Sequence, residues 1–184
     1  MAEAKSALTD AVRAMIGVQA ERVQASLWGV EREDLRRFTQ AIMDPDPRYW
    51  DDEFAKSTRF GAIVTPPAYC MYLRTKTAAW EEDPITRAYR EDPDTDAGVT
   101  FRGGRGALPP IPTDLKRTLN AGTEIEVYKY PALGDVIFSQ GRYADIKARS
   151  GKDGSSFLII TTETVYTDQN GALLCLLRAS SFLR

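Results

Sequence analysis

The residues whose types and spacing best suit chemistry lie in one short run, MDPDPRYWDDE, at positions 43–53. The run combines carboxylates with two prolines, a tyrosine and a tryptophan. A carboxylate placed in this way is either solvated or a catalytic acid or base, and near neutral pH its usual catalytic partner is histidine. The chain contains no histidine, which excludes Ser-His-Asp and Cys-His arrangements built from this chain alone. Asp, Glu, Tyr, Lys and Cys remain as groups that can transfer a proton.

The composition indicates one globular domain over residues 1–184. A hydrophobic fraction of 43% supplies enough apolar residues for a core, and a net charge of -2 gives no overall attraction to nucleic acid. Cys70 and Cys175 are the only cysteines. We therefore expect neither a disulfide framework nor a zinc site, and we interpret both cysteines as small buried apolar residues. No metal site is predicted, although an all-carboxylate site for a hard cation stays open in principle.

The chain shows no pattern of a targeting or membrane segment. Residues 1–19 are expected to form an N-terminal helix, and they carry an early acid and no long apolar run, which is unlike a signal peptide. No stretch approaches the roughly 18 apolar residues that a membrane helix needs. We therefore expect a cytoplasmic protein without a membrane partner.

The element that must position the run is an amphipathic helix over residues 31–42, with Leu35, Phe38 and Ile42 on one face. Acidic residues lie in its first turn, where the helix dipole favours them. The prolines of the run disfavour continuation of the helix, so the acidic run is expected to follow the helix end directly. A short strand near residues 23–27 is expected before it.

After the run, residues 51–56 are expected to make one helical turn, and residues 69–80 to form an apolar helix that starts beyond Pro66 and Pro67. Residues 81–117 differ in character, because they are first acidic with prolines and then basic with many glycines and prolines. We interpret them as a long irregular insertion, either functional or a solvated loop, rather than a second domain.

From residue 118 onward the sequence has the character of β-structure. Stretches rich in β-branched and aromatic residues, separated by turn signals, predict an antiparallel meander of three or four long strands, in which consecutive strands are neighbours. Asn170-Gly171 predicts a hairpin turn between the last two. One apolar helix ahead of such strands suggests a sheet wrapped around that helix, which is an α+β fold.

The run and its flanks resemble a known family. The stretch FTQAIMDPDPRYWDDEFAKSTRFGAIVTPP resembles the MaoC-like dehydratase and (R)-specific enoyl-CoA hydratase family. In that family a helix ends in F-x-x-x-x-G-D-x-N-P-I-H-x-D, and a Gly-x-Ile stretch leads into the central helix. The residues of this sequence that match are Phe38, Asp44, Pro47, Asp51, Ala55, Gly61 and Ile63. The likeness covers roughly residues 20–184, is strongest to the N-terminal type of MaoC dehydratase domain, and implies the hot-dog fold.

The resemblance also implies a chemistry. Such enzymes hydrate a trans-2-enoyl thioester with an aspartate and a histidine that bracket the water, while a backbone N–H at the start of the central helix polarises the carbonyl. The substrate is a coenzyme A thioester, and no cofactor is implied. Asp44 occupies the aspartate position, Tyr49 the histidine position and Pro66 the position of the glycine that donates its N–H. Tyrosine, with an ordinary pKa near 10, is a poor base, and proline has no N–H, so two of three requirements are missing.

The remaining site residues follow from the same resemblance or from their charge. Gly61, Pro66 and Tyr69 are expected to line the substrate site at the start of the central helix. The cations expected for the phosphates of coenzyme A are Arg102, Arg105, Lys116 and Arg117, with Lys147, Arg149 and Lys152 as a second cluster. Structural interpretations stay open beside these: either cluster is also explained as solvated charge, Asp44 as a turn cap and Tyr49 as a packing residue.

We therefore expect a subunit of a heteromeric enoyl-CoA hydratase or 3-hydroxyacyl dehydratase. A histidine-bearing MaoC-like hot-dog chain is the expected partner, with a homodimer otherwise, and this chain shapes an acyl-CoA tunnel that suits fatty acyl or bulky steroid side-chain substrates. Two alternatives stay open. One is a self-contained hydratase that uses Asp44 with modified chemistry, and the other is a non-enzymatic acyl-CoA or lipid-binding hot-dog protein.

Overall fold

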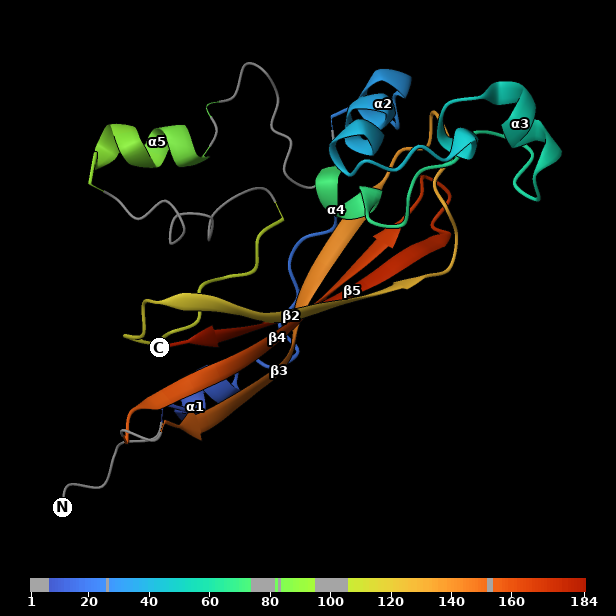
Figure 1. Ribbon diagram of the computed structural model, residues 1–184. Coiled ribbons are helices and arrows are strands. Elements are labelled where there is room, and N and C mark those ends of the chain that lie inside the picture. Colours follow the sequence, from blue (N-terminus) through green and yellow to red (C-terminus); the bar gives the residue numbers. More distant parts are fainter. Residues whose placement is uncertain (1–6, 26, 74–81, 83, 95–105, 152–153) are drawn as a thin grey trace.

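A five-stranded antiparallel sheet forms the centre of the molecule (Figure 1). The computed structural model describes residues 7–25, 27–73, 82, 84–94, 106–151 and 154–184. The strands lie in the order β1-β3-β4-β5-β2, and their bounds are β1 Val23–Gln24, β2 Thr118–Val127, β3 Phe138–Ser150, β4 Ser156–Thr167 and β5 Leu173–Leu183. The long strands coincide with the stretches rich in β-branched and aromatic residues, as predicted.

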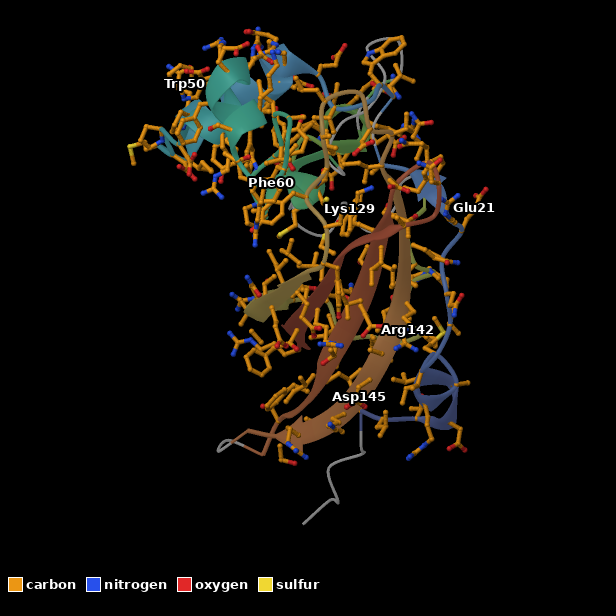
Figure 2. All side chains as sticks on the ribbon, turned by 90° about the vertical axis from the view of Figure 1, so that its right-hand side faces the viewer. Glu21, Trp50, Phe60, Lys129, Arg142 and Asp145 are labelled. Carbon is orange, nitrogen blue, oxygen red and sulfur yellow. The ribbon has the colours of Figure 1, made fainter. Side chains whose placement is uncertain are left out.

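Apart from α5, Pro84–Glu91, the described helices lie at the two ends of the sheet. Those at one end are α2 Arg32–Ala41, η1 Pro47–Tyr49, α3 Asp52–Ser57 and α4 Tyr69–Leu73, while α1 Asp10–Arg13 lies at the other end (Figure 1). Two apolar clusters correspond to these ends: one contains residues of α2, α4 and the start of β5, and the other contains Val12 of α1 and the end of β5. Figure 2 shows Trp50 and Phe60 at the helical end, and Arg142 and Asp145 farther along the sheet.

The two faces of the sheet differ in what covers them. Along β4, Leu158 and Ile160 belong to the apolar cluster at the α1 end, and Tyr166 belongs to the cluster under α4. These three residues are spaced in steps of two, so they share the covered face. Glu163 lies on the opposite face, where its carboxylate accepts hydrogen bonds from Arg142 Nε at 2.8 Å and from Arg178 Nε at 3.1 Å. This period-two alternation of apolar and polar residues is typical of a sheet with one covered face.

Several predictions of the sequence need correction. β2 pairs with β5 rather than with β3, because the chain crosses from one edge of the sheet to the other, so the strands are not a simple meander. Helix α5, Pro84–Glu91, lies within the 81–117 stretch that was expected to be irregular. The described N-terminal helix is a single turn, Asp10–Arg13, and not the whole of residues 1–19. In the expected helix over residues 69–80, the part that the structure describes is α4, and the remainder lies outside the described residues.

A chain of hydrogen bonds fixes the segment that leads into α4. The N–H of Thr65 donates to the carbonyl of Pro131 at 2.9 Å, and Val64 forms a bridge to Ala132. The carboxylate of Asp135 accepts from the N–H of Ala132 at 2.8 Å and from the side-chain amide of Gln169 at 3.0 Å. The start of α4 is therefore held by the β4–β5 turn through two loops. Within the described residues, no helix is long and apolar enough to cross a membrane.

Candidate active site

The turn that carries the acidic run begins with a left-handed residue. Met43, which follows the C-terminal cap residue of α2, Ile42, has a φ of 55° and is the one described non-glycine residue with a positive φ. This conformation lets the N–H of Asp44 donate back to the carbonyl of Thr39 at 3.0 Å, which ends the helix. Met43 stands where the family pattern has glycine, the residue that adopts this conformation without strain.

The carboxylate of Asp44 has a local partner. One of its oxygens accepts a hydrogen bond from the N–H of Asp46 at 3.2 Å. Asp46 in turn accepts from the N–H of Arg48 at 3.0 Å and from its Nε at 2.8 Å, and the hydrogen bonds from Arg48 lower the pKa of Asp46. The sequence Asp-Pro-Asp-Pro-Arg thus closes a turn on itself, which agrees with the turn-cap interpretation of Asp44.

Tyr49 lies next to this carboxylate but is unsuited to accept a proton. Its side chain is 5% exposed. Burial first, and then the negative charge of Asp44, raise the pKa of Tyr49 above its ordinary value. The structure therefore brings together the two residues at the expected catalytic positions, and it keeps the tyrosine protonated at neutral pH.

The start of α4 lacks the expected N–H donor. Pro66 is buried, and its carbonyl accepts from the N–H of Tyr69 at 3.1 Å. Tyr69 is fully buried against Phe38, with ring centroids 5.4 Å apart in an edge-on arrangement. Burial raises the pKa of Tyr69, and its hydroxyl has no hydrogen-bond partner among the described residues. Pro66 and Tyr69 thus lie in a packed core here.

The other predicted residues lie apart from Asp44 and Tyr49. Gly61 is exposed in the loop after α3, and Arg102 and Arg105 lie outside the described residues. Lys116 and Arg117 are exposed at the start of β2, and the N–H of Arg117 donates to the carbonyl of Arg184 at the far end of β5. Helix α4 packs over the opposite end of β5, so Lys116 and Arg117 lie the length of that strand away from α4, about 35 Å for eleven residues. The structure does not bring them to the acidic run.

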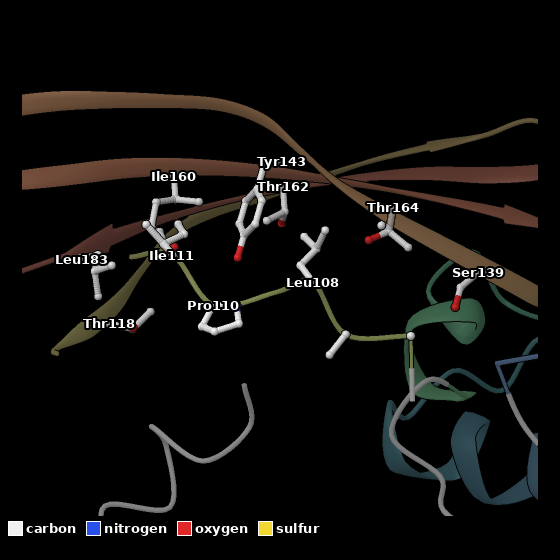
Figure 3. Close-up of a pocket in the computed structure, with 14 residues that line it drawn as sticks. Leu108, Pro110, Ile111, Thr118, Ser139, Tyr143, Ile160, Thr162, Thr164 and Leu183 are labelled. Atoms are coloured by element: carbon white, nitrogen blue, oxygen red, sulfur yellow. The ribbon is translucent and has the colours of Figure 1, made fainter. Parts of the chain in front are cut away.

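A cavity of about 210 Å³ lies on the covered face of the sheet, between α4 and the α1 end. Its floor is formed by β3, β4 and β5 together with Thr118 of β2, and its other wall is the segment 106–111, which we call the strap (Figure 3). Figure 3 shows Leu108 and Ile111 of the strap facing the sheet, and Ser139 at the end nearest α4. The sequence alone does not indicate this site, because the residues that build it come from strands whose register only the fold reveals.

Two contacts fix the strap over the sheet. The hydroxyl of Tyr143 donates to the carbonyl of Pro109 at 2.8 Å. Gly106, with a φ of +72°, approaches β1 so closely that an added Cβ would lie 2.4 Å from a methyl group of Val23. The strap therefore begins at a position that only glycine fits.

Gly106→Ala is expected to lower the free energy of unfolding by about 2 kcal/mol, through left-handed strain together with the clash against Val23. Gly171→Ala is the matched control, because Gly171 has a φ of +80° and open space around its Cβ direction. Urea denaturation should show a loss about half as large for the control. Equal losses for the two variants would contradict the close approach of the strap.

Comparison with known proteins places the chain among dehydratase-like sequences. A family model described as "FAS1-like, dehydratase domain region" matches residues 14–177. A UPF0336 protein of Saccharopolyspora erythraea is 26% identical over 155 residues, which is 84% of this chain and 81% of that protein.

Several solved structures share the fold. A chain of the ChsH1-ChsH2 complex from Mycobacterium tuberculosis matches with a TM-score of 0.66 and 16% identity, over 94% of this chain and 88% of that chain. A chain of the C-terminally truncated HadBC (3R-hydroxyacyl-ACP dehydratase) complex from the same organism gives a TM-score of 0.57 and 15% identity. The match covers 91% of this chain and 96% of that chain. A MaoC-like dehydratase from Rhodospirillum rubrum gives 0.57 and 18%, over 91% of each chain. The predicted hot-dog fold is confirmed.

Proposed function

This chain belongs to the FAS1-like dehydratase domain family, of the MaoC-like hot-dog type, and we propose that it is the non-catalytic subunit of a heteromeric enoyl-CoA hydratase or 3-hydroxyacyl dehydratase. In this role it completes a double hot-dog and shapes the acyl-CoA tunnel. A partner chain of the same fold supplies the aspartate and the histidine that activate water. The proposal accounts for a site that keeps its turn and its aspartate but lacks a base.

The observation that carries the proposal is the state of Tyr49. Hydration of an enoyl thioester needs a group that accepts a proton from water near neutral pH. Tyr49 stands at the histidine position, is almost completely buried, and has a pKa above that of an ordinary tyrosine. A protonated phenol cannot serve as this base, so the proton must go to another group, and the proposal assigns that group to the partner.

Two further observations support a partner of the same fold. Among the described residues β2 pairs with β5 alone, so its outer edge presents backbone N–H and C=O groups that another strand can bind. The similar structures named ChsH1-ChsH2 and HadBC are complexes of two chains. An exposed edge and heteromeric relatives are what a heteromeric hot-dog subunit requires.

Co-purification from the native source, followed by identification of bound chains by mass spectrometry, tests the proposal. We expect a second hot-dog chain that carries histidine, and we expect the complex to hydrate a trans-2-enoyl-CoA. The substitution Asp44→Asn in this chain should change the rate of the complex by no more than about twofold. Hydration by the homo-oligomer, abolished by Asp44→Asn, would contradict the proposal and support a self-contained enzyme. Acyl-CoA binding without turnover in any complex would support a non-enzymatic binding protein.

A further inference from the structure

The cavity beneath the strap has a lining that selects for ligand chemistry. We propose that it binds the distal part of an acyl chain that carries a neutral oxygen substituent, a hydroxyl or a keto group, and that it prefers such a chain to a plain alkyl chain. This inference rests on the proposed function, because it assigns the acyl class that the subunit helps to select.

The floor of the cavity carries a row of hydroxyl groups. Ser139, Thr164, Thr162 and Ser181 all contribute to the lining. Ser139 is 6% exposed and Thr164 is 5% exposed, and neither hydroxyl makes a hydrogen bond within the described part of the chain. Thr162 makes one long bond, to the carbonyl of Ala179 at 3.3 Å. Buried hydroxyls normally have partners, so these groups are suited to a ligand oxygen that accepts hydrogen bonds from them, as both a keto oxygen and a hydroxyl can.

The other surfaces of the cavity are apolar. Leu108, Pro110 and Ile111 of the strap form one wall, and Ile160 and Leu183 close the end toward α1 (Figure 3). An occupant therefore needs an apolar body along the strap and a polar group along the sheet. A plain alkyl chain would leave the floor hydroxyls without partners. The free-energy cost of these unpaired polar groups makes the site discriminate against a plain chain and in favour of one that carries an oxygen.

The charge of the lining excludes two other ligand classes. Every residue that lines the cavity is neutral. A phosphate or a carboxylate would be buried there without a counter-ion, which is unfavourable. The polar group of the ligand is therefore an uncharged oxygen, and the phosphates of coenzyme A lie outside this cavity.

The position of the cavity suits the tail of a substrate rather than its reacting end. Ser139 pairs in the sheet with Tyr166, which belongs to the apolar cluster under α4. From there the cavity follows β4 away from α4, and the rise of an extended strand puts Thr164 and Ile160 about 13 Å apart. A chain that enters beside α4 thus reaches Ser139, Thr164 and Thr162 before the apolar end, where Ser181 lies beside Ile160.

Thioester binding measured by calorimetry tests the proposal without any need for turnover. The probes are decanoyl N-acetylcysteamine and hydroxydecanoyl N-acetylcysteamine thioesters with the hydroxyl at different carbons, titrated into the full chain and into its complex. We expect at least one hydroxylated probe to bind about tenfold more tightly than the plain one. The variant Thr162→Val/Thr164→Val keeps the shape of the floor and should abolish this preference with little effect on the plain probe.

A matched control lies on the same strand. Thr161 faces the opposite side of the sheet, where its hydroxyl lies 3.1 Å from that of Ser180, so Thr161→Val should leave the preference intact. Equal binding of all probes by the parent chain, or a preference that survives in Thr162→Val/Thr164→Val, would overturn the proposal. If the preference holds while no complex hydrates any enoyl thioester, the proposed function fails and the cavity assignment stands.

Discussion

Without a partner, the chain is expected to hydrate a trans-2-enoyl-CoA at least about 10⁴-fold more slowly than the complex with a histidine-bearing hot-dog chain. A positioned general base contributes about 10²–10⁴ to the rate, and one backbone donor to the carbonyl oxygen about 10²–10³. Tyr49 is protonated and Pro66 has no N–H, so the chain alone lacks both contributions. The measurement is kcat/KM for each preparation at the same pH.

Two variants separate the missing base from the missing donor. Tyr49→Phe removes the hydroxyl and should leave the activity of the complex unchanged within about twofold, because a buried, protonated phenol takes no part in the reaction. In the isolated chain, Tyr49→His alone should give little activity, since Pro66 still offers no N–H, whereas Tyr49→His/Pro66→Gly should give a measurable gain that Asp44→Asn removes. A loss of activity in the complex caused by Tyr49→Phe would refute the assignment of Tyr49 as a packing residue.

The local parts of the fold and of the site could be predicted from the sequence. Helix α2, Arg32–Ala41, lies within one residue of its predicted bounds, because Leu35 and Phe38 repeat at helical spacing and prolines follow. Asp44 and Tyr49 are five residues apart in the sequence, and one short turn that includes η1 holds both. Properties set by neighbours along the chain are encoded in a few adjacent residues.

Non-local features could not be predicted in this way. The pairing of β2 with β5 joins Thr118 to Leu183, and no local pattern records that choice of partner. The hydroxyl row of the cavity depends on the register of three strands, so its members look like ordinary alternating strand residues in the sequence. Lys116 and Arg117 formed a plausible cluster by charge, but their distance from Asp44 follows from the direction in which β2 runs.

Helix α5 was missed for a different reason. Its first residue is Pro84, a position at which proline favours a helix start. The acidic, proline-containing composition of the surrounding stretch was interpreted as irregular, and this outweighed the local start signal. Composition averaged over a long window therefore concealed a helix of eight residues.

The largest stability effect among the polar residues is expected at Asp168. Its side chain is 1% exposed, and its carboxylate accepts from Lys129 Nζ at 2.7 Å and from the N–H groups of Asn170 and Ala172, each at 2.9 Å. It thus holds both the β4–β5 turn and the chain that leaves β2 (Lys129 is labelled in Figure 2). Asp168→Ala leaves these donors without an acceptor and should lower the free energy of unfolding by about 3 kcal/mol.

Asp168→Asn isolates the charge, because it keeps an acceptor oxygen for the turn but loses the attraction to Lys129. The hydrogen bond from Lys129 holds the pKa of Asp168 below its ordinary value. A carboxylate whose pKa is lower in the folded state stabilises the fold fully above its unfolded pKa, about 3.9, and this contribution disappears as the pH falls through the folded value. The difference in stability between the parent and Asp168→Asn should therefore be largest between about pH 5 and 7 and should shrink below about pH 4.

Urea denaturation of both proteins across this pH range measures the difference in stability, with Lys129→Met as the control that removes the same ion pair from the other side. A difference that stays constant down to about pH 3 would mean that Asp168 acts through its hydrogen bonds to the turn alone. The same β4–β5 turn contacts, through Gln169, the loop that holds Thr65 next to Pro131. A substitution that destabilises the turn would therefore also destabilise the start of α4.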